Sequence, residues 1–336
     1  MTDSDAGFPE DMRRFLADLG IQGQDLRARP LTGGVSSDIW FVEVDGRALC
    51  IKRALPTLRV AAHWTAPVER SGFEYAWFER VREIAPAAVP PLIGRHAGGN
   101  MFAMAFLPAD RYPVWKALLL RGTVDAAFAA AVGEILGAIH AGTAGDGRTA
   151  GAFATDASFH ALRLEPYLLA TARRHPDLAD RLQAIAATTG TTKLVLVHGD
   201  VSPKNILAGP EGPVILDAEC AWYGDPAFDL AFCLNHLLLK CLPVRDRTGL
   251  LMDAFDRMAG AYLPHVSWED AAAFESRCAA LLPALLLARV DGKSPVEYVT
   301  GETDREIVRG VARGLVAEPP DRLSTVRHRW LDGLRH

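Results

Sequence analysis

Two short polar segments of the chain have residue types and a spacing that suit phosphoryl transfer. Residues 198–205 read HGDVSPKN, and residues 216–219 read LDAE. Phosphoryl transfer needs a carboxylate that orients the attacking hydroxyl and oxygen ligands that hold Mg²⁺ against the phosphates. We therefore predict that Asp200 is the catalytic base and that Asn205 and Asp217 are metal ligands.

Each of these segments follows an apolar run that predicts a buried strand. Residues 194–197 (LVLV) precede Asp200, and residues 214–216 (VIL) precede Asp217. Taken alone, His-Gly-Asp is as consistent with a turn and a capping carboxylate as with catalysis. The joint pattern is far more specific, because the polar positions fall at the required spacing after two separate strands.

Residues nearer the N-terminus are candidates for binding a nucleotide. Gly33, Gly34 and Ser36 precede a predicted hairpin, where backbone N–H groups and a hydroxyl can contact phosphates. A Gly-Gly pair between strands is, however, more often only a turn. Lys52 ends the second hairpin strand inside an apolar run, so it is either a snorkelling edge residue or a phosphate-binding cation.

A phosphate-binding lysine on such a strand pairs with a glutamate on the next helix. The predicted helix at 67–84 carries Glu69 and Glu74, and Glu74 is the better inward-facing candidate because it lies among aromatic residues. A solvated helix face is the alternative for Glu74. The backbone groups of Ala105 and Leu107 are candidates for contacting adenine, although any edge strand exposes such groups.

The wider pattern predicts an α+β chain with a small β-rich lobe followed by a large helical lobe. The predicted elements are a helix at 9–21, a hairpin of strands 39–44 and 48–52 around Asp45-Gly46, a strand at 100–107, and helices at 124–141, 158–188, 226–242, 247–262 and 268–290. Because the composition changes after Pro108, we place the N-lobe at 1–107 and the C-lobe at 108–336.

The bulk properties exclude several classes of protein. The chain has 336 residues and a net charge of −5, which offers no electrostatic footprint for nucleic acid or an anionic membrane. The longest apolar run, 279–288, contains Pro283 and falls short of the roughly 20 residues that a membrane span needs. The five cysteines lack metal-site spacing, and residues 1–5 do not resemble a signal peptide. We therefore expect a cytoplasmic protein with reduced cysteines.

Five further polar residues have predicted roles near these motifs. Asp229 is expected to hydrogen-bond the catalytic loop, and Asp225, before a proline, to cap a helix. His198 is expected to orient the loop without transferring the proton, and His140 to pack in the core. Arg289 faces either solvent or the acceptor pocket.

With these motifs in place, the chain from Leu31 to about Tyr298 resembles the aminoglycoside phosphotransferase and choline kinase-like superfamily. The resemblance implies the bilobal protein kinase-like fold. It also implies that Lys52 binds the α- and β-phosphates of ATP, that Asp200 is the base, and that Asn205 and Asp217 ligate Mg²⁺.

Local stretches resemble methylthioribose kinase in particular. The matching segments are 52–56 with Trp64, 69–70, 217–224, 228–230 and 237–239. By this resemblance Glu219 is a second metal carboxylate, as in the Asp-x-Glu pattern of that kinase. The catalytic loop departs from it, because the Pro-Lys-Asn ending matches the Pro-x-Asn of other superfamily members. Protein kinase activity is disfavoured, since Ala-Glu rather than Phe-Gly follows Asp217 and Ser202 replaces a lysine.

The sequence therefore predicts an ATP-dependent small-molecule kinase. Residues 108–197 hold eight acidic and nine basic residues, which favours a sugar-like hydroxyl acceptor over a polycationic aminoglycoside or an amino alcohol such as choline or homoserine. A catalytically silent nucleotide-binding scaffold is the rival interpretation, but Lys52, Asp200 and both metal positions are present. No sequence motif indicates an oligomeric state.

Overall fold

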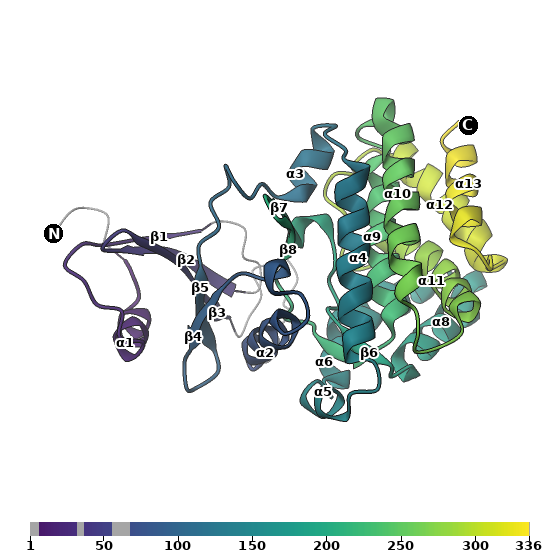
Figure 1. The fold of residues 1–336 in the computed structure, drawn as a ribbon. Coiled ribbons are helices and arrows are strands. Elements are labelled where there is room, and N and C mark those ends of the chain that lie inside the picture. The colour runs from purple at the N-terminus through teal and green to yellow at the C-terminus, as the bar shows by residue number, and fades with distance from the viewer. Residues whose placement is uncertain (1–6, 32–36, 56–67, 336) are drawn as a thin grey trace.

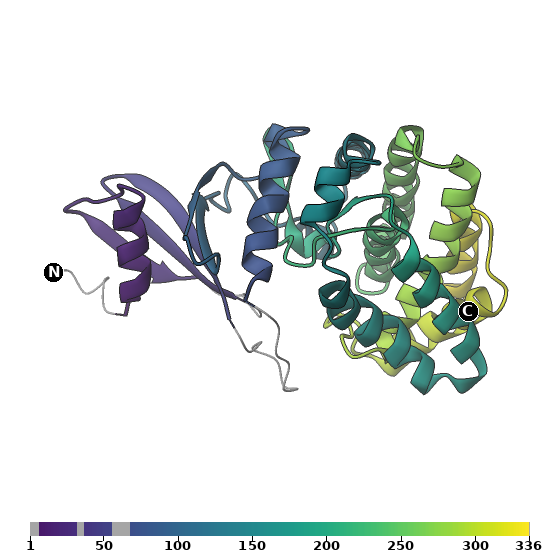
Figure 2. The same ribbon diagram turned by 90° about the horizontal axis from the view of Figure 1, so that it is seen from below.

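A small β-rich region precedes a large helical region, as the sequence predicts (Figure 1). The computed structural model describes residues 7–31, 37–55 and 68–335. An antiparallel sheet in the order β1-β2-β3-β5-β4 dominates the first region. Its strands are β1 (Leu26–Pro30), β2 (Ser37–Val44), β3 (Arg47–Ala54), β4 (Leu92–Arg95) and β5 (Met101–Ala105). Helix α1 (Glu10–Asp18) packs its apolar face on the sheet, and Figure 2 shows α2 (Arg70–Arg82) between the sheet and the helical region.

The hairpin of β2 and β3 fixes the direction of Lys52. Asp45 and Gly46 have φ values of 47° and 80°, the left-handed pair that a two-residue hairpin turn of this type requires. Successive side chains on a strand point to opposite faces. Because Ile51 packs in the cluster that α1 covers, Lys52 points to the other face, where α2 lies.

The helical region contains more elements than the sequence pattern indicates. It comprises α3 (Trp115–Leu120), α4 (Ala126–Thr143), α5 (Gly147–Ala152), α6 (Asp156–Phe159), a π-helix η2 (His160–Leu169), α7 (Ala170–Arg174), α8 (Ala179–Thr191), α9 (Pro226–Lys240), α10 (Thr248–Tyr262), α11 (Ala271–Asp291), α12 (Glu302–Ala317) and α13 (Leu323–Gly333). Short 3₁₀ turns η1 (Pro86–Ala88), η3 (Pro176–Leu178), η4 (Pro203–Asn205), η5 (Arg245–Arg247) and η6 (Leu263–His265) join them. The views of Figures 1 and 2 place α4, α9 and α10 together at the centre of this region.

The prediction of one helix at 158–188 is wrong. The segment changes to π geometry at His160, contains Pro166 and is interrupted again by the 3₁₀ turn that starts at Pro176. Proline lacks the N–H that continues a helix, and the residue before it is displaced from helical geometry. The break matters for function, because π-helical segments frequently lie at functional sites.

Two short hairpin-like sheets carry the predicted catalytic segments. Strand β6 (Val195–Val197) pairs with β9 (Trp222–Gly224), and β7 (Ile206–Gly209) pairs with β8 (Gly212–Ile215). Strands β6 and β8 end just before residues 198–205 and 216–219, as predicted. The two polar segments therefore leave the C-terminal ends of two buried strands in separate small sheets.

Within the described part of the chain, two helices, α4 and α11, are long and apolar enough to cross a membrane by length and composition. The number rises to three if the bent pair Pro226–Lys240 and Arg245–His265 counts as one span. This corrects the expectation drawn from the apolar run at 279–288. Helix α4 packs against α10, and α11 packs against α9 and α12. Helix α11 also buries Arg289 and Asp291, so its contacts are those of a core helix in this lobe.

Candidate active site

Lys52, Glu74 and Asp217 form a connected set of charges between the two regions. The Lys52 ammonium lies 2.8 Å from Glu74 Oε1 and also donates to Asp217 Oδ1. Burial opposes the charged form of Lys52, but the two carboxylates outweigh it and raise the pKa of the lysine. The pairing resolves the choice between the two glutamates of the α2 segment: Glu74 is buried against Lys52, and Glu69 is exposed at the start of the helix.

Asp200 lies in the catalytic loop among donors. Its Oδ2 accepts hydrogen bonds from Lys204 Nζ at 2.8 Å and from Asn205 Nδ2 at 2.9 Å, and Arg163 Nη2 lies 3.2 Å from the same oxygen. Burial favours the neutral acid, but the charges of Lys204 and Arg163 outweigh it and lower the pKa of Asp200. The carboxylate is therefore ionised at neutral pH, as a group that orients a hydroxyl must be.

The oxygens of Asn205 and Asp217 are directed at one cation. Lys204 Nζ is 3.0 Å from Asn205 Oδ1 and 3.7 Å from Asp217 Oδ2, so the ammonium shows where a positive ion is held between them. An amide and a carboxylate oxygen are hard ligands of the type that Mg²⁺ prefers. The donor set therefore fits Mg²⁺, although the described residues contain no cluster of three His, Cys, Asp or Glu side chains that could hold a metal.

Asp217 and Gly199 adopt backbone conformations that ordinary residues avoid. Asp217 has a φ of 68°, a left-handed conformation that is uncommon outside glycine and that turns the side chain out of the end of β8. Gly199 has a φ of 77°, and a Cβ atom there would lie 2.5 Å from the carbonyl oxygen of Cys220. The loop thus requires glycine immediately before the base.

His198 and Asp229 hold the loop in place, as predicted. Asp229 Oδ2 and Oδ1 accept from the backbone N–H groups of His198 at 2.7 Å and Gly199 at 2.9 Å. His198 Nδ1 accepts from the Asp200 N–H at 3.1 Å, so the Nε2–H donates to the carbonyl of Leu216 at 3.0 Å. Burial lowers the pKa of His198, which agrees with this neutral form.

The two other predicted structural roles are also confirmed. Asp225 caps α9 by accepting from the N–H of Ala227 at 3.0 Å. His140 is a buried core histidine whose Nδ1 lies 2.6 Å from the hydroxyl of Tyr262. Its Nε2 is 3.3 Å from Asp229, so this histidine also supports the residue that anchors the loop.

The other predicted nucleotide contacts remain predictions. Gly33, Gly34 and Ser36 lie outside the described residues. The N–H of Ala105 donates to the carbonyl of Pro91 at 2.8 Å, so this N–H is already engaged, and a contact of adenine with the backbone of Ala105 stays a prediction. Leu107 lines a cavity of about 420 Å³ beside the segment that links the lobes, together with Tyr112, Val214 and other residues.

Glu219 and Arg289 have partners of their own. Glu219 Oε2 lies 3.2 Å from Arg70 Nε, so a role as a metal ligand stays a prediction. Arg289 is buried and donates to the hydroxyl of Tyr167 at 3.1 Å, which removes the alternative that it faces solvent.

Sequence reasoning missed Arg163 and Lys204. Arg163 is in the π-helix and also donates to the carbonyl oxygen of Gly199, so it contacts the loop twice. A lone arginine within the segment FHALRLEPYLL (159–169) carries no signal for such a role, because the loop that it contacts is distant in sequence. Lys204 could have been noticed, since it directly precedes the predicted ligand Asn205.

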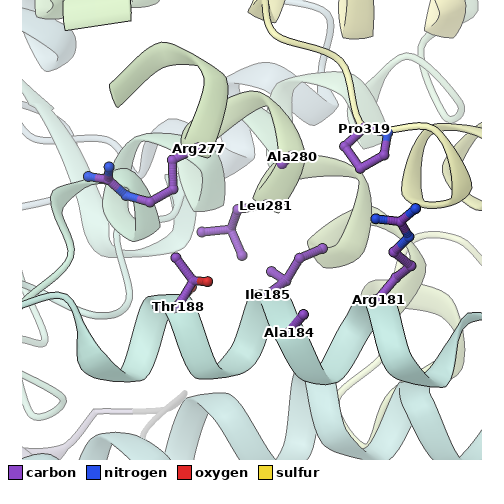
Figure 3. Close-up of a pocket in the computed structure, with 9 residues that line it drawn as sticks. Arg181, Ala184, Ile185, Thr188, Arg277, Ala280, Leu281 and Pro319 are labelled. Carbon is purple, nitrogen blue, oxygen red and sulfur yellow. The ribbon is translucent and has the colours of Figure 1, made fainter. Parts of the chain in front are cut away.

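A separate cavity of about 160 Å³ lies away from this cluster, between α8 and α11. Figure 3 shows Arg181 and Arg277 at opposite ends of a mainly apolar lining that includes Ile185 and Leu281. None of the predicted site residues that the structure describes lines it. It is therefore not part of the site built around Asp200.

Comparison with known proteins decides the family. The model of the phosphotransferase enzyme family matches residues 27–260, which include Lys52, Asp200 and Asp217. The chain belongs to this family. This phosphotransferase is thus an enzyme of the class that transfers phosphate to hydroxyl groups of small molecules. No curated protein matches the sequence.

Solved structures share the fold of this phosphotransferase at low identity. A choline/ethanolamine kinase family protein from Mesorhizobium loti has 15% identity and a TM-score of 0.51, over 96% of this chain and 99% of that one. An amicoumacin kinase in complex with AMP-PNP and Ca²⁺ has 13% identity and a TM-score of 0.53, over 94% and 96%. An ethanolamine kinase from Plasmodium vivax has 11% identity and a TM-score of 0.51, over 99% and 90%. These likenesses establish the bilobal kinase-like fold.

Proposed function

We propose that the protein is an ATP-dependent kinase that phosphorylates a hydroxyl group of a sugar-like small molecule. The observation that carries the proposal is the convergence of Asp200, Asn205 and Asp217 around one cation position, which the ammonium of Lys204 occupies. Asp217 also contacts Lys52, which is 165 residues away in the sequence. A scaffold that only binds a nucleotide has no need of an ionised carboxylate beside the metal ligands. The rival interpretation therefore leaves Asp200 unexplained.

The reaction forms a bond between the acceptor oxygen and the γ-phosphorus of ATP and breaks the bond from that phosphorus to the β,γ-bridging oxygen. Asp200 accepts the hydrogen bond of the hydroxyl and takes its proton, which then passes to solvent. ADP leaves with the bridging oxygen. Lys52, held by Glu74, binds the α- and β-phosphates. Gly33, Gly34 and Ser36 contribute phosphate contacts from the N-lobe, 1–107, while the C-lobe, 108–336, holds the acceptor.

Mg²⁺, when bound by Asn205 and Asp217, neutralises the charge of the phosphates. In that state Lys204 must leave the position between the two oxygens, and its exposed side chain has room to do so. Glu219 remains within reach of the same loop and joins as a second carboxylate if it releases Arg70. Because ATP is the donor, we propose that the enzyme acts in the cytoplasm.

The acceptor is better described as sugar-like than as a polycation. Two positive side chains, those of Arg163 and Lys204, contact Asp200, where the acceptor hydroxyl must lie, and they would repel a polycationic aminoglycoside. The amicoumacin and ethanolamine kinases show only that the fold accommodates varied acceptors.

The test is ADP release by wild-type enzyme and by Asp200→Asn on a panel of methylthioribose, other sugars, sugar acids, choline, homoserine and kanamycin. The variant should keep its stabilisation by Mg-ATP but lose about 10²–10⁴-fold in kcat, the usual scale for a general base. If Asp200→Asn turned over any accepted compound at the wild-type rate, Asp200 would not be the catalytic base. If kanamycin or choline were the only compounds turned over, the proposal of a kinase would stand, but the proposal of a sugar-like acceptor would be wrong.

A further inference from the structure

Two cationic side chains and a histidine are buried in the helical lobe, and we refer to Lys240 and Arg289 as the acceptor-side cations, with His236 beside them. Helix α9 supplies His236 and Lys240 one turn apart, and α11 supplies Arg289. The hydroxyl of Tyr298 joins the first two, at 3.0 Å from His236 Nδ1 and 3.4 Å from Lys240 Nζ. The mechanism proposed above uses none of them.

The acceptor-side cations are close to the reaction centre. Burial lowers the pKa of His236, and the positive charges of Lys240, Arg289, Lys204 and Lys116 lower it further. Lys204 is the residue that contacts Asp200. Helix α3, which carries Lys116, packs against η4, which carries Lys204. Arg289 donates to the hydroxyl of Tyr167, whose ring centroid lies 5.8 Å from the guanidinium of Arg163. Because Arg163 contacts Asp200, the acceptor-side cations are linked to the catalytic loop through Tyr167.

No carboxylate balances Lys240 or Arg289 among the described residues. Lys240 is fully buried, and its charge is met only by the hydroxyl and the ring of Tyr298, whose centroid is 4.6 Å from Nζ. Arg289 donates to the hydroxyls of Tyr167 and Ser294 and to a backbone carbonyl, and its Nε has no hydrogen-bond partner within the described chain. Both nearby carboxylates are taken: Glu297 by Lys116, and Asp200 by its own donors.

Such a surplus of buried positive charge is unfavourable unless a negative group completes it, because an uncompensated buried charge is expensive. A purely structural cation is the alternative, and the ring of Tyr298 gives Lys240 some support. That alternative does not explain why Arg289 adds a second buried positive charge to the same place. Lys193 offers a contrast, since it also contacts an aromatic ring, at 3.9 Å from the centroid of Trp222, but has a carboxylate partner in Asp156.

We infer that the hydroxyl acceptor carries an oxyanion, a carboxylate or a phosphate, and that His236 and Arg289 bind this group while Lys240 supplies charge from behind them. The inference rests on the proposed kinase function and narrows its acceptor from a neutral sugar to an anionic one. The Nε2 of His236 and the Nε of Arg289 supply the unused donors. Anionic hydroxyl compounds such as sugar acids and sugar phosphates have both required groups.

The first experiment measures oxyanion binding without turnover. Thermal unfolding of wild type, Lys240→Met and Lys193→Met is followed with saturating Mg-AMP-PNP, so that the nucleotide site is filled. Inorganic phosphate and malonate are compared with chloride at equal ionic strength. We expect one oxyanion to raise the wild-type and Lys193→Met melting temperatures by at least about 2 °C more than chloride does, and to have no such effect on Lys240→Met. Phosphate alone points to a phosphorylated acceptor, and malonate alone to a carboxylate.

The second experiment compares matched acceptors. ADP release is measured with glucose, glucuronate and glucose 6-phosphate, and with glycerol, glycerate and glycerol 3-phosphate. An anionic member should exceed its neutral partner at least about 10-fold in kcat/KM, and Lys240→Met should remove that preference through KM. Equal oxyanion effects on wild type and Lys240→Met, or an equal preference for neutral acceptors in both, would overturn the inference. If Mg-AMP-PNP itself fails to stabilise wild type, the kinase proposal fails instead, and the oxyanion shift is read separately.

Discussion

Buried charges are paired on one side of the catalytic loop and unpaired on the other. On the nucleotide side, Lys52 is buried between Glu74 and Asp217, and each charge has an opposite partner inside the protein. On the proposed acceptor side, Lys240 and Arg289 are buried without a carboxylate partner among the described residues. Both sets lie in the interior, where charge is costly.

The difference indicates which set is complete and which set waits for a ligand. Paired charges hold their geometry before any substrate arrives, which suits a lysine that must meet phosphates in a fixed place. Unpaired cations gain most when an anion arrives, so they convert the binding of the correct acceptor into local stability. The contrast therefore predicts opposite consequences when single charges are removed on the two sides.

The largest effect is expected on the nucleotide side. Glu74→Gln leaves Lys52 with one carboxylate fewer, and breaking a buried pair from one side costs about 3–5 kcal/mol. Urea denaturation of the protein without ligands measures the loss. Glu69→Gln is the matched control, because this exposed glutamate precedes the same helix and should change stability by less than about 0.5 kcal/mol. Equal losses in both variants would mean that the pair with Lys52 is not special.

The next effect concerns the nucleotide itself. A ligand that binds only the folded state stabilises it by about 2.7 kcal/mol at a hundred times its Kd. Mg-ATP should give the wild type a thermal shift of this origin, and Lys52→Met and Asp217→Asn should lose most of it. Lys240→Met should keep the whole shift, because Lys240 is on the acceptor side. If Lys240→Met lost its stabilisation by Mg-ATP, Lys240 would contribute to nucleotide binding, and the two sides could not be distinguished.

On the acceptor side, removal of a cation should stabilise the free protein by on the order of 2 kcal/mol near neutral pH. Burial, reinforced by the nearby charge of Lys116, lowers the pKa of Lys240 to about 7. Between pH 7 and the ordinary lysine range, the unfolded chain therefore binds a proton that the folded protein does not. Stability must rise with pH across this window, and below pH 7 the full penalty remains.

Denaturation of wild type and Lys240→Met at pH 6, 7, 8 and 9 checks this sign. The advantage of the variant should be greatest at pH 6 and should shrink towards pH 9. Lys193→Met serves as the control, because this lysine is partly exposed and paired with Asp156, so its curve should run parallel to that of the wild type. An advantage of Lys240→Met that does not depend on pH would point to packing rather than charge.

The smallest predicted effect lies in the loop that both sides share. Gly199→Ala forces a Cβ into left-handed geometry and towards the carbonyl of Cys220, at a cost of about 1–2 kcal/mol. Because the loop carries the base, kcat should fall by a similar factor for every acceptor. Gly260→Ala, at an open position in α10, should be neutral or slightly stabilising. If the loss of kcat in Gly199→Ala differed between acceptors, the loop would act on acceptor binding rather than on the position of the base.

The sequence was sufficient for the parts of the site that depend on local patterns. The apolar runs before Asp200 and Asp217 predicted β6 and β8, and the Asp-Gly pair predicted the hairpin that orients Lys52. These features could be read because strand, turn and loop chemistry are set within a few residues. The two-lobed fold followed from the same elements, in their order along the chain.

The rest depends on contacts between distant segments. Strands β1 and β4 are short edge strands with polar or glycine residues, so their pairing partners decide their structure more than their own pattern does. Arg163 reaches Asp200 only because the helix around it is broken and wound as a π-helix. From the sequence, Lys240 is expected to be a solvated lysine at the end of a helix. It is buried because α11 and the segment around Tyr298 pack against α9.

Helix α9 joins the chemistry to the choice of acceptor. Asp229, which anchors the loop, His236 and Lys240 are spaced by seven and four residues, so they lie on one face of the helix. A shift or rotation of α9 would therefore move Asp229 together with His236 and Lys240. Changes of substrate that require a new position for this helix would disturb the catalytic loop, whereas changes confined to α11 or to Tyr298 would leave the loop undisturbed. We expect new specificities to arise on the partners of α9, with the helix itself kept as a fixed frame.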